Sequence, residues 1–72
     1  MKKYDVVGLK RELPTKGLAA LAQGTILMVY EAPSAPRAFE VEFLDDHGRT
    51  QALITIEETD VELVWSAPED ET

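Results

Sequence analysis

The sequence predicts a small, mostly-β domain, and three observations support this prediction. β-Branched and aromatic residues gather in five short segments, and turn-forming residues separate these segments. The segment from Phe39 to Leu44 alternates strictly between apolar and acidic residues, which is the period of a half-buried strand. A chain of 72 residues has room for a single domain.

Five strands are predicted, each of about five to seven residues. They are Tyr4 to Leu9, Thr25 to Tyr30, Phe39 to Leu44, Thr50 to Ile56 and Val61 to Trp65.

Alternation assigns a face to each side chain of these strands. In the third strand we expect Phe39, Val41 and Phe43 to point inward and Glu40 and Glu42 to point outward. In the fourth strand Ala52, Ile54 and Ile56 share one face. In the second strand we expect Ile26, Met28 and Tyr30 on one face and Leu27 and Val29 on the other.

The connections between the strands differ in kind. Asp45 to Gly48 predicts a short hairpin, because glycine adopts the left-handed conformation that closes such a turn. Glu31 to Ala38 contains Pro33 and Pro36 and is expected to form a loop outside the sheet. In the long stretch between the first two strands, Leu18 to Ala22 favours at most one helical turn.

Five short strands, a long first loop and a tight turn before the last strand predict an SH3-like barrel. A five-stranded OB-type barrel is the competing fold, but it normally places a helix where this chain has only a hairpin. Curvature and closure protect the edges of so small a sheet. We expect one domain over residues 1–65 and a disordered acidic tail over residues 66–72, which carry no large apolar side chain.

Three stretches resemble a small bacterial family, the domain of unknown function 4926. They are the opening strand from Tyr4 to Leu9, the segment Gly24 to Tyr30, and the run from Phe39 through Thr50 to Leu53. The resemblance implies an SH3-like fold and no established activity. It also suggests a role as the partner of a neighbouring small protein, of the antitoxin or immunity type.

The charge of the chain is strongly negative and unevenly distributed. The net charge is −7, and from Glu57 onward there are seven acids and no Lys or Arg. Such a surface repels nucleic-acid phosphates and suits a basic protein. The basic residues concentrate near the start of the chain, where Lys2, Lys3, Lys10, Arg11 and Lys16 form the one cluster that could attract RNA.

No catalytic residue, metal site or cofactor is predicted. His47 is the only histidine, and it lies among turn residues that point in different directions. The four glycines are too scattered for a phosphate-binding loop. The chain contains no cysteine, which fits the cytoplasm, and we expect neither a signal peptide nor a membrane span.

The leading functional hypothesis is a non-catalytic protein-interaction module that binds a basic protein. Its contact residues are expected to be Tyr30, Glu40, Glu42 and Trp65, because aromatic anchors dominate interfaces and acidic residues steer a basic partner. Two alternatives remain open at this point. One is a structural domain that forms a homodimer, since the second strand is apolar on both faces, and the other is a weak RNA-binding barrel.

Overall fold

The computed structural model describes residues 1–69 and consists of five strands and two short 3-10 helices. The elements are β1 (Val6–Leu9), η1 (Pro14–Lys16), β2 (Gln23–Ala32), β3 (Ala35–Leu44), β4 (Thr50–Glu57), η2 (Glu58–Asp60) and β5 (Val61–Trp65). All pairings are antiparallel, and the strand order is β4-β3-β2-β1-β5. The predicted fold class, a five-stranded mostly-β domain, is confirmed. No helix within residues 1–69 is long and apolar enough to cross a membrane.

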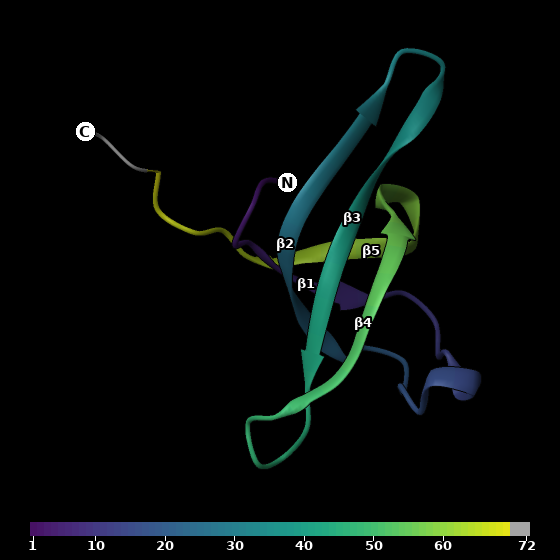
Figure 1. The fold of residues 1–72 in the computed structure, drawn as a ribbon, viewed down its shortest axis with the longest axis vertical. Coiled ribbons are helices and arrows are strands. Elements are labelled where there is room, and N and C mark those ends of the chain that lie inside the picture. The colour runs from purple at the N-terminus through teal and green to yellow at the C-terminus, as the bar shows by residue number, and fades with distance from the viewer. Residues whose placement is uncertain (70–72) are drawn as a thin grey trace.

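The predicted barrel is not closed. β2, β3 and β4 run side by side, and β1 and β5 cross behind them at an angle (Figure 1). In the described part of the chain β4 pairs only with β3 and β5 pairs only with β1. The strand order and the single turn of η2 before the last strand are consistent with an SH3-like fold, but the seam between the two edges stays open.

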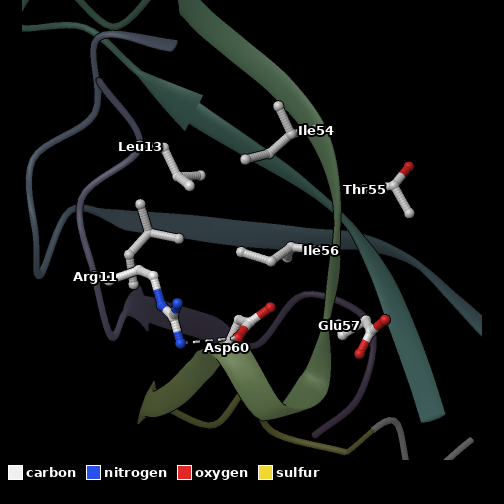
Figure 2. A pocket seen from close by; sticks show the side chains of 8 residues that line it. Arg11, Leu13, Ile54, Thr55, Ile56, Glu57 and Asp60 are labelled. Carbon is white, nitrogen blue, oxygen red and sulfur yellow. Dashed lines mark ion pairs between the residues drawn. The ribbon is translucent and has the colours of Figure 1, made fainter. Parts of the chain in front are cut away.

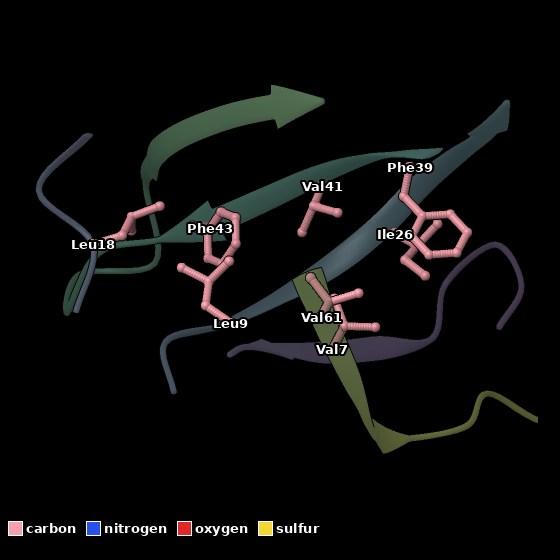
Figure 3. Packing of buried hydrophobic residues seen from close by; sticks show 8 residues of the cluster. All are labelled: Val7, Leu9, Leu18, Ile26, Phe39, Val41, Phe43 and Val61. Atoms are coloured by element: carbon pink, nitrogen blue, oxygen red, sulfur yellow. The ribbon is translucent and has the colours of Figure 1, made fainter. Parts of the chain in front are cut away.

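The core forms between the long strands and the β1–β5 pair. It comprises eight buried apolar residues: Val7, Leu9, Leu18, Ile26, Phe39, Val41, Phe43 and Val61. Figure 3 shows Phe39 and Ile26 at one end of this cluster and Leu18 and Phe43 at the other. The predicted alternation of β3 is confirmed, and burying each large side chain of this kind stabilises the fold by about 1.5–3 kcal/mol.

The predicted faces of β2 are wrong, because the strand contains a bulge between Ile26 and Met28. Ile26 pairs with Val41 and Met28 pairs with Glu40, so one residue of β2 has no counterpart on β3. An extra residue reverses the alternation beyond it. Ile26 is therefore buried, whereas Met28 and Tyr30 are exposed on the opposite face of the sheet.

The predicted loop from Glu31 to Ala38 is wrong. β2 continues to Ala32, β3 begins at Ala35, and only two residues form the turn of this long hairpin. Pro36 lies within β3, but β4 ends opposite Ala38 and offers no residue across from this proline. Its missing N–H therefore removes no bond between β3 and β4.

The first loop also differs from its prediction. Its helical turn is η1, which starts at Pro14 and is capped by Gly17 at a φ of +70°. Leu18 to Ala22 is not helical, because Leu18 is drawn into the core and Leu21 takes a positive φ of 68°. The predicted hairpin between β3 and β4 is confirmed, and Gly48 closes it at a φ of +77°.

Asp5 joins the segment before β1 to the residues that follow β5. It is only 1% exposed, and its carboxylate accepts the backbone N–H of Lys2 (2.9 Å) and of Ala67 (2.8 Å). The Lys2 ammonium (3.1 Å) and the Ser66 hydroxyl (3.3 Å) complete the set. Ser66 and Ala67, the first two residues of the segment predicted to be a disordered tail, thus donate hydrogen bonds to Asp5. Residues 70–72 of that segment lie outside the described residues.

Replacing the carboxylate of Asp5 should reveal its contribution to the stability of the fold, because that contribution depends on pH. Burial alone raises the pKa of Asp5, but the N–H groups of Lys2 and Ala67 and the Lys2 ammonium outweigh burial and lower the pKa to about 2. The ionised form therefore stabilises the fold by about 2 kcal/mol above the ordinary pKa, and this contribution is lost as the pH falls from about 4 to about 2. In urea denaturation at pH 6, the free energy of unfolding of the wild type should exceed that of Asp5→Asn by about this amount, and the difference should decrease toward pH 2. A difference independent of pH would contradict the assignment.

Gly24 lies where there is no room for a side chain between β2 and β3. A Cβ at this position would lie 2.6 Å from Val41 Cγ1 and 2.9 Å from the carbonyl oxygen of Glu42. Because the second contact is backbone, the strands must separate, and Gly24→Ala should lower the free energy of unfolding by about 1–3 kcal/mol. Gly8→Ala is the matched control, since its nearest contact is a Val64 methyl at 3.3 Å. Chemical denaturation should show the larger loss at Gly24, and equal losses would refute the close-approach explanation.

Candidate functional site

The outer surface of β2, β3 and β4 brings together three of the four predicted contact residues. We call this surface the acidic face. The strand register arranges it in three rows: Thr25, Glu42 and Leu53; Met28, Glu40 and Thr55; Tyr30, Ala38 and Glu57. None of these nine positions holds a Lys or Arg.

Hydroxyl groups hold the two central carboxylates of the acidic face. Tyr30 donates its phenolic hydrogen to Glu40 (2.9 Å), and the Thr55 hydroxyl lies 3.5 Å from the other oxygen of Glu40. Thr50 donates to Glu42 at 2.6 Å. Among the ion pairs of residues 1–69, none involves Glu40 or Glu42. Their negative charge is therefore oriented but not neutralised.

Apolar side chains flank these carboxylates. Met28 is 50% exposed, Leu53 is 54% exposed, and Tyr30 is 40% exposed. Large apolar groups next to oriented polar groups are typical of the centre of a protein interface. Sequence reasoning missed Met28 and Leu53: the bulge moves Met28 outward, and pairing with Glu42 places Leu53 on the same surface.

Trp65 lies outside these nine positions. It ends β5 and pairs with Val6, and β1 and β5 lie beyond β2 in the strand order. Its side chain is 53% exposed, and Leu63 and Val64 beside it are exposed as well. The pairs Trp65–Val6, Val6–Thr25 and Thr25–Glu42 continue one row of the sheet, so Trp65 shares that row with Glu42 but lies two strands beyond β2, outside the nine positions of the acidic face.

The other acids near the end of the chain are partly neutralised. Glu58 lies 3.3 Å from the Arg37 guanidinium, which also contacts Glu31 at 3.0 Å. Asp60 lies 3.9 Å from Arg11. Of the acids from Glu57 to Glu69, Glu57 is the one that occupies a position of the acidic face.

A groove lies along the open seam of the sheet. Its volume is about 490 Å³, and it separates β4 from the first loop and η2. The lining residues are Leu9, Arg11, Leu13, Ile54, Thr55, Ile56, Glu57 and Asp60. Figure 2 shows Ile54 and Ile56 pointing toward Leu13, whereas Thr55 points away on the other side of β4. The sequence analysis does not predict this groove, because local patterns do not reveal a seam between two distant edges of the sheet.

The turn that contains His47 is held by hydrogen bonds between the Asp45 side chain and the backbone. One oxygen of Asp45 accepts the N–H groups of His47 (2.8 Å) and Arg49 (2.9 Å), which fixes the hairpin. Within residues 1–69 no group of three or more His, Asp or Glu side chains is placed to hold a metal ion.

Part of the N-terminal basic cluster is engaged within the domain. Lys2 pairs with Asp5 and also donates to Ser66 at 2.7 Å, and Arg11 pairs with Asp60. Lys3 lies over the Tyr4 ring, 5.2 Å from its centre. These contacts divide the cluster between the chain terminus and the rim of the groove rather than forming one continuous basic surface.

The bond between Tyr30 and Glu40 should be visible in a titration. The hydrogen bond to Glu40, with burial and the charge of Glu40 adding to it, raises the pKa of Tyr30 above its ordinary value. Glu40→Gln should therefore lower the pKa of Tyr30, because the neutral amide no longer favours the protonated phenol. The ultraviolet absorbance of tyrosinate measures this in a Tyr4→Phe background, where Tyr30 is the only tyrosine. An unchanged titration curve would show that the two groups are uncoupled in solution.

The comparisons with known proteins agree with the resemblance noted in the sequence. No curated protein and no solved structure gives a significant match to the chain. A family model does match, and it covers β1 to β4 and most of β5. Since the match extends over residues 3–63, the chain belongs to the family described as Domain of unknown function (DUF4926).

Proposed function

We propose that this protein is a non-catalytic interaction module whose acidic face binds a basic protein. The observation that carries the proposal is the composition of that face. Glu40 and Glu42 are oriented by hydroxyl donors and form no ion pair within residues 1–69, and Met28 and Leu53 are exposed beside them. Such carboxylates speed the encounter with a basic surface and set its orientation. The apolar side chains and Tyr30 supply the contact area.

An antitoxin or immunity role fits this arrangement. A basic toxin would be neutralised if its charged surface were covered by the acidic face, and the net charge of −7 favours rapid capture. The absence of cysteine supports action in the reducing cytoplasm.

Self-association is the second candidate, and a different surface favours it. Leu63, Val64 and Trp65 are exposed on β5, which is an edge of the sheet in the described residues. Apolar edge strands are common sites of pairing between chains.

Site-specific photo-crosslinking in the native host distinguishes these candidates. A benzophenone side chain at Met28 should give a discrete complex with one other protein, and Glu40→Lys with Glu42→Lys should abolish it. The same group at Trp65 tests for a product of twice the mass of the chain. Asp46, exposed on the β3–β4 turn, is the control position.

The identified partner is then purified and its binding measured directly. A Kd that rises at least about tenfold when Glu40 and Glu42 become lysines supports the proposal, because like charges then oppose the basic surface. No product from Met28, or a dimer from Trp65 alone, would refute binding through the acidic face.

A further inference from the structure

β4 has a free edge along the open seam of the sheet. β4 pairs with β3 on one side, and its other side borders the groove along Ile54, Thr55, Ile56 and Glu57. An edge strand presents backbone N–H and C=O groups that are ready to pair with another extended chain. This groove therefore offers hydrogen-bonding groups as well as an apolar wall.

The inner wall of the groove, formed by Ile54 and Ile56, extends the apolar core but is only half-buried. Ile54 and Ile56 continue the inward rows of Ile26 with Val41 and of Val29 with Phe39, yet both remain only half-buried. Leu9 and Leu13 form the opposite wall. An added strand would direct every second side chain between these walls, and aliphatic residues there would complete the packing.

The outward side chains of the same added strand would meet the acidic face. They would flank Thr55 and Glu57 and lie roughly 10 Å from Glu40 and Glu42, two strand spacings away. That distance is comparable with the Debye length at physiological ionic strength. Because the nine positions of the face hold three carboxylates and no cation, Lys or Arg is favoured at these outward positions.

Contacts at the two ends of the groove limit the length of an added strand. Gln51, at the start of β4, donates to the carbonyl oxygen of Gly17 in the first loop at 2.9 Å. Asp60, just after β4, pairs with Arg11 at 3.9 Å, and this exposed, long ion pair contributes little and can open. About four residues of an extended chain fit between these ends.

We propose that the groove binds an extended segment of a partner protein in which aliphatic residues alternate with Lys or Arg, and that this segment pairs with the edge of β4. This inference rests on the proposed interaction function and specifies how the partner docks. A second copy of the chain suits the groove less well. Its own exposed edge, β5, carries Glu62 between apolar residues and would bring a carboxylate toward Glu57.

Nuclear magnetic resonance titration of the full chain tests the proposal with a capped seven-residue peptide of alternating lysine and valine. The amide signals of residues 54–57 should shift most, and in a saturable manner. A peptide with glutamate in place of lysine should not bind. A peptide with N-methyl groups on alternate residues should also fail, because it keeps the charge but cannot complete the ladder.

Variants of the chain provide the matched comparison. Glu57→Gln should weaken binding of the lysine peptide about two- to fivefold, the range for one exposed charge pair. Glu62→Gln removes the same charge from an exposed residue of β5 and should leave the affinity unchanged. Equal binding by the N-methylated peptide, with shifts spread over the whole acidic face, would overturn strand addition in favour of charge attraction alone.

The two proposals fail in distinguishable ways. If crosslinking at Met28 captures a partner but neither that partner nor the lysine peptide shifts residues 54–57, the acidic face functions and strand addition is wrong. If the peptide pairs with β4 but Met28 captures nothing, the groove is real and the acidic face is not its biological contact. Concentration-dependent broadening of residues 54–57 without peptide would instead assign the groove to a second copy.

Discussion

The structure depends on β3, which pairs with β2 on one side and with β4 on the other. Its inward residues Phe39, Val41 and Phe43 are all buried, and its outward residues Glu40 and Glu42 lie on the acidic face. One strand therefore supplies both the core and the charge of the surface. Because alternate side chains point in opposite directions, a shift in its register by one residue would bury both carboxylates and expose both phenylalanines.

The bulge in β2 allows this neighbouring strand to contribute side chains to both the core and the acidic face. Before the bulge Ile26 packs into the core, and after it Met28 and Tyr30 reach the outer surface while Val29 turns inward. Bulges also increase the local twist of a sheet. The β1–β5 pair crosses the long strands in Figure 1, and the crossing leaves the inner side of β4 without a covering strand. The acidic face and the groove thus share β4 as their common boundary.

The parts of this fold that the sequence predicted are those with strong local patterns. The strict alternation of β3, the apolar row Ile54 and Ile56 of β4, and the hairpin closed by Gly48 are each encoded within a few neighbouring residues. The faces of β2 were predicted incorrectly because four apolar residues in succession do not reveal an extra one. Pro36 suggested a loop because sequence alone does not show that β4 ends before reaching it.

The candidate site was predicted only in part, for a related reason. Glu40 and Glu42 follow from alternation, and Tyr30 joins them through the register of β2 with β3. Trp65 was chosen by residue type alone, and the strand order places it two strands beyond β2. The groove depends on two edges that remain apart, a property of the whole sheet that no single segment encodes.

The carboxylate of Asp5 makes the stability of the domain depend on the two residues that follow β5. Two of its four hydrogen bonds come from Ser66 and Ala67, so cleavage directly after Trp65 would leave a buried negative charge with half of its donors. An under-satisfied group of this kind costs about 1–3 kcal/mol, a large share of the stability of so small a domain. A protease that trims the chain to its last strand would therefore weaken the whole fold, although it removes no residue of the sheet or of the apolar core.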